Sequence, residues 1–171
     1  MSRKNEAVVS WPSLKILSSR NQLEKLRKTL EDYPTDDIEV EAALCRFLVL
    51  RSCGHVELCL EQGVVDFLEK TAPPHVHGYI RSGMFKGRNP WPNRIEELLG
   101  AFFDDWGRQI KEFLDADDEL LNRELKFLIQ KRNSIAHGQS EGVARRKALD
   151  LCDYAILLAD KIIDIVAPVR E

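Results

Sequence analysis

The spacing of apolar residues along this chain predicts helices almost throughout. Apolar positions recur every three or four residues, the period of one helical face, over residues 14–32, 36–70, 93–114, 117–136 and 141–167. Pro34 ends the first segment, the Thr35-Asp36-Asp37 cluster can cap the second, and Ser140 is the expected cap of the last. No alternating pattern of β-branched residues predicts a strand. We expect an all-α, up-and-down bundle of about five to six helices.

Two segments fall outside this helical pattern. We expect a single domain over residues 1–171, within which residues 1–13 are expected to be a flexible tail. Residues 73–94 are rich in proline and glycine and are expected to form an irregular basic loop. The loop carries aromatic side chains that could stack on bases or form a protein-docking surface: Tyr79, Phe85 and Trp91.

One arginine occupies a position where an apolar residue is expected. Leu121, Leu125 and Leu128 step by four and three residues, and the same stripe continues through Arg132 to Ile135. A guanidinium cannot lose its charge to escape burial, so it needs a paired anion or a wet cleft. Either the fold pairs Arg132 internally, or the site receives an anionic ligand.

The helix predicted over 36–70 repeats this irregularity. Its apolar stripe is interrupted by Arg51 and His55, which lie one helical turn apart, and Gly54 beside them would let another backbone approach closely. Two interpretations stay open. Buried carboxylates such as Glu57 or Glu97 could pair with Arg51 and His55, or both residues could face the same cleft as Arg132.

The net charge of −3 conceals two basic segments. Residues 123–147 hold seven basic and two acidic side chains, and residues 73–94 hold four basic side chains and no acidic one. Concentrated basic segments on an acidic body can bind a polyanion, although such charge runs can also be solvated faces.

Several classes of function find no support in the sequence. The four cysteines form no C-x-x-C pair and are expected to be reduced core residues. The close histidines His75 and His77 lack further ligands, so we expect no metal and no cofactor. No apolar run approaches the length of a membrane helix, and a cytoplasmic location without membrane contact is expected.

The segment from Arg132 to Gly138 carries the chemistry that points to RNA. Gly138 suits the left-handed position that ends a helix, which places His137 in the last turn, where the carbonyl ends favour a cation. Cleavage of RNA by its own 2′-hydroxyl needs a general base, a general acid and a cation for the charged phosphorane. His137 and Arg132 fit these roles, and Asn133 could orient either the histidine or the ligand. One chain supplies one such histidine, so a two-fold homodimer with facing motifs is expected.

The motif Arg132-Asn133-x-x-x-His137-Gly138, at the end of one helix and before a final long helix, resembles that of the HEPN superfamily, in particular its prokaryotic single-domain members. The likeness covers the helical layout of roughly residues 36–167. It implies a helical bundle that dimerises through the motif face, with metal-independent endoribonuclease activity in active members. Arg132 would contact the scissile phosphate, Asn133 would be the polar residue that usually follows the arginine, and His137 would be the acid–base residue.

The resemblance also suggests a biological role. Many such proteins resemble toxins or defence effectors that an antitoxin or another regulatory protein holds inactive, whereas others act as binding or scaffold domains. The leading hypothesis is an RNA-cleaving homodimer in which basic residues near the motif contact the substrate: Arg51, His55, Lys131, Arg145 and Arg146. The alternative is a non-catalytic helical module that binds a protein or nucleotide partner.

Overall fold

The computed structural model describes residues 11–73, 75, 76, 78, 89–138 and 142–168. Over these residues the chain is an all-α packed bundle without strands, which confirms the predicted fold class. The helices are α1 (Leu14–Asp32), α2 (Ile38–Thr71), α4 (Pro92–Gly100), α5 (Asp104–Ala136) and α6 (Arg145–Ile165).

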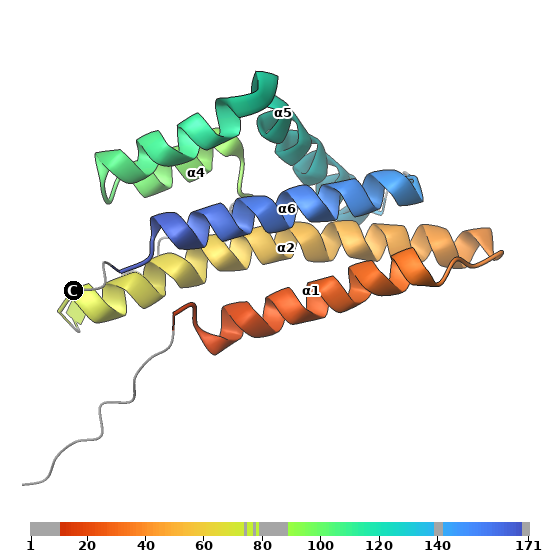
Figure 1. Ribbon diagram of the computed structural model, residues 1–171, viewed down its shortest axis with the longest axis horizontal. Helices are drawn as coiled ribbons and strands as arrows, with labels where there is room; N and C mark the ends of the chain where they lie inside the picture. The colour runs from red at the N-terminus through yellow and green to blue at the C-terminus, as the bar shows by residue number, and fades with distance from the viewer. Residues whose placement is uncertain (1–10, 74, 77, 79–88, 139–141, 169–171) are drawn as a thin grey trace, which may run out of the picture.

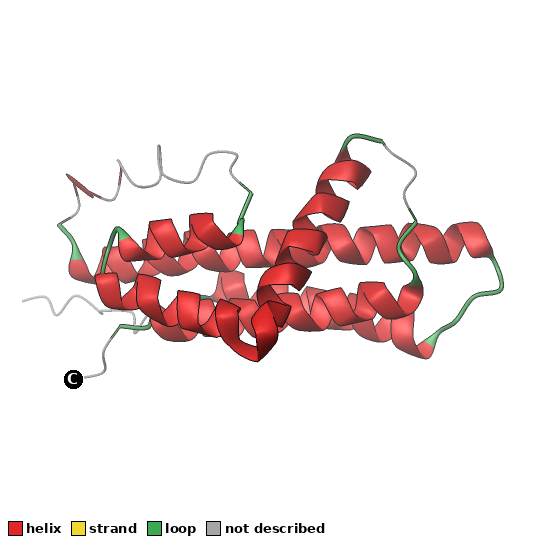
Figure 2. Ribbon diagram, turned by 90° about the horizontal axis from the view of Figure 1, so that it is seen from above, coloured by secondary structure: helices red, strands yellow, loops and turns green. Residues whose placement is uncertain are grey.

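The long helices α1, α2 and α6 lie side by side (Figure 1), with α2 packed mainly against α6 and then against α1. Helix α4 and the first part of α5 pack on each other on the opposite side of α6 from α1. The remainder of α5 crosses the long helices at a steep angle (Figure 2). The core lies where α2, α5 and α6 meet, and its fully buried side chains include Leu48, Val49, Leu128, Ile129, Leu151 and Ile162.

The helix boundaries follow the expected capping chemistry at α2. The Asp37 carboxylate accepts from the backbone N–H groups of Glu39 at 3.0 Å and Val40 at 3.2 Å, two of the amides that a helix start leaves unpaired. The expectation for the last helix was wrong by several residues. Helix α6 begins at Arg145 with Ala144 at the cap position, and the expected cap Ser140 lies outside the described residues.

The prediction of one helix over 93–114 was also wrong. Helix α4 ends at Gly100 and α5 begins at Asp104, so the chain turns back over residues 101–103. The backbones of the two helices approach so closely that a Cβ added to Gly107 would lie 2.9 Å from the Cα of Gly100. Helical spacing hides this turn, because aromatic residues occupy both the turn and the following helix: Phe102, Phe103 and Trp106. Trp106 is buried and Phe102 packs against the core, whereas Phe103 is 49% exposed beside the rings of Phe67 and Trp106.

The predicted break near residues 115–118 is confirmed within α5. Ala116 leaves the helical conformation, and Asp117, Asp118 and Glu119 follow with φ of 50°, 55° and 60°. Side chains with a Cβ rarely adopt this left-handed region, although aspartate tolerates it better than most. The break divides α5 into a first half, 104–115, and a second half, 120–136.

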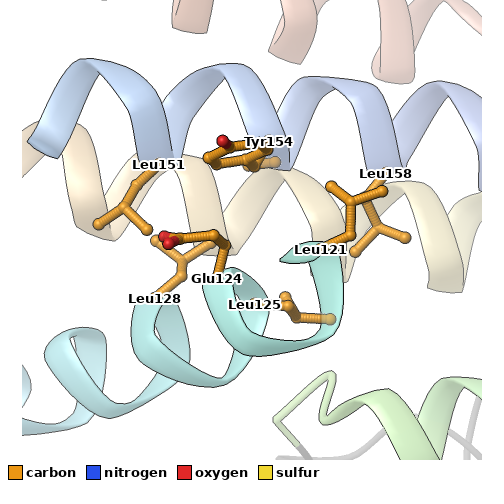
Figure 3. A pocket seen from close by; sticks show the side chains of 8 residues that line it. Leu121, Glu124, Leu125, Leu128, Leu151, Tyr154 and Leu158 are labelled. Atoms are coloured by element: carbon orange, nitrogen blue, oxygen red, sulfur yellow. The ribbon is translucent and has the colours of Figure 1, made fainter. Parts of the chain in front are cut away.

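The second half of α5 is fixed to α6 by a layer of leucines (Figure 3). Leu121, Leu125 and Leu128 face Leu151 and Leu158 around a void of about 10 Å³, which is around the size that a single water molecule needs. Glu124 at the edge of this layer accepts from Lys147 Nζ at 2.6 and 2.8 Å. This packing holds the motif end of α5 on the bundle.

Candidate functional site

Arg132 sits at the edge of the core rather than inside it. One turn and two turns earlier on the same face, Leu128 and Leu125 are buried, but 34% of the Arg132 side chain remains exposed. The helical face that carries this stripe is therefore buried at Leu125 and Leu128 and partly accessible to solvent at Arg132. A guanidinium in this position keeps part of its hydration and can still meet an anion from solvent.

Two side chains hold the guanidinium of Arg132. Its Nη2 lies 3.4 Å from Oε1 of Glu57 on α2, and its Nη1 donates to Oδ1 of Asn133 at 3.2 Å. The Glu57 contact is an ion pair without a described hydrogen bond, and 26% of the Glu57 side chain is exposed. The Arg132 pair is therefore half-buried and open to solvent, unlike a sealed core ion pair.

Asn133 receives a second donor from a distant part of the chain. Nδ2 of Asn89, which lies just before α4, donates to the same Oδ1 of Asn133 at 3.2 Å. Four polar side chains thus form one connected group, defined here as the motif network: Glu57, Asn89, Arg132 and Asn133.

His137 closes the helix that carries the motif. Helix α5 ends at Ala136, and the backbone N–H of His137 donates to the carbonyl oxygen of Asn133 at 3.0 Å. Gly138 follows with φ of +74°, the left-handed conformation expected for it, so the helix-end prediction is confirmed. The imidazole is exposed and sits beside helix carbonyls that attract a cation.

Arg51 and His55 lie on the side of α2 that faces α1, and neither expected carboxylate pairs with them. Glu57 contacts Arg132 instead, and Glu97 pairs with Arg94. Nη2 of Arg51 donates to the Gln22 side chain at 3.0 Å. Both residues line a groove of about 440 Å³ between α1 and α2, whose wall also includes Lys15, Ser18, Ser19, Gln22, Leu50, Gly54 and Leu58. No described contact joins Arg51 or His55 to the motif network, so their role in binding RNA stays a prediction.

The imidazole of His55 is buried and neutral. It is 2% exposed, its Nδ1 lies 3.0 Å from Oγ of Ser19, and Sγ of Cys59 lies 3.6 Å from its Nε2. Burial, followed by the nearby charge of Arg20, lowers the pKa of His55 to about 4.

This buried histidine gives a pH-dependent stability. The folded pKa of about 4 lies below the unfolded value of 6.5, so the unfolded chain binds more protons between these values. Stability is therefore expected to be full above pH 6.5 and to fall by about 3 kcal/mol as the pH drops to 4. Urea unfolding of the wild type and of His55→Leu over this range measures the effect. The prediction fails if the two proteins lose stability in parallel.

The remaining predicted RNA-binding residues have intramolecular partners. Nη2 of Arg145 donates to the carbonyl oxygens of Leu30 and Glu31 at 2.6 and 2.7 Å, which caps the end of α1. Arg146 is mostly exposed and pairs with Asp150 at 3.0 Å. Nζ of Lys131 lies 5.4 Å from the centre of the Phe127 ring. Arg145 thus stabilises the end of α1. Lys131 lies near the motif end of α5, and Arg146 lies at the start of α6.

Sequence reasoning did not identify two members of the motif network. The sequence indicates Glu57 only as a partner of Arg51 and His55, and it assigns no role to Asn89, which lies in the proline-rich residues 73–94. No local pattern could have revealed Asn89, because its bond to Asn133 joins segments that are far apart in sequence. Of the three aromatic residues of that loop, Trp91 packs against the core, and Tyr79 and Phe85 lie outside the described residues.

The cysteines are buried and free, as expected: Cys45, Cys53, Cys59 and Cys152. Burial raises the pKa of Cys53 and Cys59 to about 12, which disfavours the reactive thiolate. In the described ranges, no group of three or more histidine, cysteine, aspartate or glutamate side chains is placed to hold a metal ion. None of the described helices has an apolar stretch long enough to cross a bilayer.

Comparison with known proteins places this helical chain in a family. Residues 14–167, from the start of α1 to just beyond α6, match the family described as RiboL-PSP-HEPN. No curated protein and no solved structure gave a match. The match spans every helix named above and includes the whole motif network. The chain therefore belongs to the RiboL-PSP-HEPN family of the HEPN superfamily, which is associated with ribonuclease activity.

Proposed function

We propose that this protein is a metal-independent endoribonuclease that acts as a homodimer. The observation that carries the proposal is the state of Arg132, whose guanidinium is held in place by Glu57 and Asn133 but stays one-third exposed. It lies on the same helix end as the exposed His137. A positioned cation near an accessible imidazole suits the transition state of phosphodiester cleavage.

The proposed reaction needs no group beyond RNA and these side chains. One His137 removes the proton of the 2′-hydroxyl, and the 2′-oxygen attacks the adjacent phosphorus. The bond from phosphorus to the 5′-oxygen breaks, and a second, protonated His137 gives its proton to that leaving oxygen. The products are a 2′,3′-cyclic phosphate and a 5′-hydroxyl, while Arg132 stabilises the charged phosphorane between them.

The two histidines would come from two copies of the chain, and Gly54 supports this part of the proposal. A glycine inside a helix costs about 1 kcal/mol relative to alanine, so its presence in the middle of α2 needs a reason. A Cβ at Gly63 or Gly107 would contact other atoms at 3.0 Å or less, whereas a Cβ at Gly54 would meet no atom of the described residues within 4 Å. Packing within the chain therefore does not require Gly54, but the close approach of a second helix would.

The side chains around Gly54 suit a second copy of α2. Phe47 is 50% exposed, and the half-buried Leu50 and Leu58 lie on the same strip of α2 as Gly54. Arg51 and Glu57 lie three residues before and after Gly54, on opposite flanks of that strip. Two α2 helices can cross at Gly54 with a left-handed or a right-handed crossing angle. One of these two arrangements places Arg51 of each copy beside Glu57 of the other. Glu57 already contacts Arg132, so this crossing would bring both motif networks to the interface.

An enzyme with this activity would damage the RNA of the cell that makes it. The proposal therefore includes the role of a toxin or defence effector that a partner protein restrains. Growth of a host that expresses the wild type or His137→Ala, without other genes, tests this part, and equal growth would contradict it.

Cleavage of end-labelled single-stranded RNA by the purified protein in excess EDTA tests the proposed chemistry. We expect fragments with 2′,3′-cyclic phosphate ends, and cleavage by His137→Ala slower by about 10²-fold or more because the acid–base group is lost. The exposed His75 offers a matched control, and His75→Ala should cut RNA normally. A strict requirement for Mg²⁺, or undiminished cleavage by His137→Ala, would contradict the mechanism.

A further inference from the structure

The motif network fixes the orientation of the Asn133 side chain. Nη1 of Arg132 lies 3.2 Å from one end of the Asn133 amide, and an arginine can only donate. The atom that it contacts must therefore be the carbonyl oxygen Oδ1. The Asn89 side chain contacts the same oxygen at 3.2 Å, so Asn89 must present its own Nδ2 as a donor.

This orientation leaves the other end of Asn133 available. Both donors go to Oδ1, and Nδ2 of Asn133 has no hydrogen-bond acceptor among the residues that the structure describes. The guanidinium of Arg132 uses Nη1 toward Asn133 and Nη2 toward Glu57, and its other N–H groups have no described hydrogen bond. The amide donor of Asn133 therefore lies next to the guanidinium of Arg132. Asn89 contacts the first side chain, and Glu57 contacts the second.

We propose that Asn89 is a positioning residue, which acts through Asn133 on the phosphate of bound RNA. The non-bridging oxygens of a phosphate can only accept hydrogen bonds, so they pair with Nδ2 of Asn133 and with Arg132. If the Asn133 amide turned over, it would present an oxygen to the phosphate and repel it. Arg132 and Asn89 both oppose this rotation, because each donates to Oδ1, and Asn89 is the one of the two that would not itself contact the phosphate. The inference rests on the proposed function and adds a residue to it.

Asn89→Asp reverses the proposed interaction with almost no change in shape. The aspartate carboxylate cannot donate, so Asn133 is expected to turn and give its Nδ2 to residue 89. The dissociation constant for a fluorescent, 2′-O-methylated RNA, which binds but cannot be cleaved, is expected to rise about tenfold or more. Asn89→Ala removes the donor without attracting Nδ2, so its effect should be smaller. For the cleavable RNA, the loss in Asn89→Asp should appear mainly in KM.

The control for added charge is Asn93→Asp, an exposed position on α4 four residues further along the chain. It adds the same negative charge four residues along the chain from Asn89, beside residues in the middle of α5, and no described contact joins it to Asn133. If Asn93→Asp weakens RNA binding as much as Asn89→Asp, general repulsion explains the result and the inference is overturned. An unchanged dissociation constant in Asn89→Asp overturns it as well.

A spectroscopic measurement separates the inference from the proposed nuclease activity. The side-chain amide of Asn133 gives a pair of NMR signals, which the loss of both signals in Asn133→Ser identifies. In the wild type these signals should shift when the 2′-O-methylated RNA is added, and in Asn89→Asp they should already be shifted without RNA. Signals that are the same in Asn89→Asp and the wild type overturn the positioning role. If these shifts occur but the wild type cuts no RNA, only the proposed function fails.

Discussion

Arg132→Ala is expected to lower kcat/KM for RNA by roughly 10²- to 10³-fold, and to change the free energy of unfolding by about 1 kcal/mol or less. The large effect on catalysis follows from the loss of the cation that stabilises the phosphorane. The small effect on stability follows from the open pair with Glu57, a single 3.4 Å contact with 34% of the arginine side chain exposed. Cleavage kinetics and urea unfolding of the same preparation measure both quantities.

The control for Arg132 is Arg108→Ala in the first half of α5. Arg108 is also paired with carboxylates, those of Asp105 and Glu112, but it is exposed and far along the helix from the motif. Its loss should leave cleavage unchanged. Arg132→Ala could instead lower the free energy of unfolding by about 3–5 kcal/mol, in a protein whose wild type cuts no RNA. That result would show that Arg132 belongs to a structural ion pair. The non-catalytic binding module would then be the better interpretation.

Gly54→Leu is expected to convert the proposed dimer into a monomer that is folded and at least as stable as the wild type. Leucine is a better helix former than glycine by roughly 1 kcal/mol, and a Cβ at this position, which lines an open groove, would meet no atom of the described residues within 4 Å. The added bulk would, however, keep a second α2 from approaching. Because the proposed mechanism needs two histidines from two copies, RNA cleavage should fall by roughly 10²-fold or more along with the dimer.

Sedimentation velocity and thermal unfolding of three variants test the dimer contact. Gly54→Ala should raise stability by about 1 kcal/mol while weakening the dimer less than leucine does. Lys28→Leu adds an exposed leucine on α1, away from the strip, and should leave the dimer intact. If Gly54→Leu remains dimeric and active, α2 does not cross its copy at Gly54. A wild type that is monomeric and active at micromolar concentration would remove the dimer from the mechanism.

Local chemistry made much of this structure predictable. The bounds of α1, the cap at Asp37 and the helix end at Gly138 all depend on neighbours within a few residues, and the structure confirms each of them. Periodicity also places Arg132 on the core-facing stripe, but it left open whether the guanidinium is paired within the chain or accessible, and the structure shows a contact with Glu57 together with 34% exposure. The turn between α4 and α5 could not be read in this way, since Phe103 and Trp106 continue the apolar spacing across it.

Contacts between distant segments decided the rest. Periodicity shows that Arg51, His55 and Glu57 share one helix, but not which neighbour each of them meets. At about 100° per residue, Arg51 and His55 point in directions about 40° apart and both meet α1, whereas Glu57 points about 120° from Arg51 and about 160° from His55 and meets α5. Asn89 meets Asn133 across 44 positions of sequence, and nothing in the sequence around Asn89 marks that contact.

The break at residues 116–119 determines which part of the bundle the motif moves with. Three left-handed residues interrupt the hydrogen-bond ladder of α5, so a displacement of the second half need not reach the first. The leucine layer and the bond from Lys147 to Glu124 attach that second half to α6. A displacement of Arg132 on phosphate binding would therefore reach α6 through this layer and the start of α4 through the bond from Asn89 to Asn133, whereas the first half of α5 would move less.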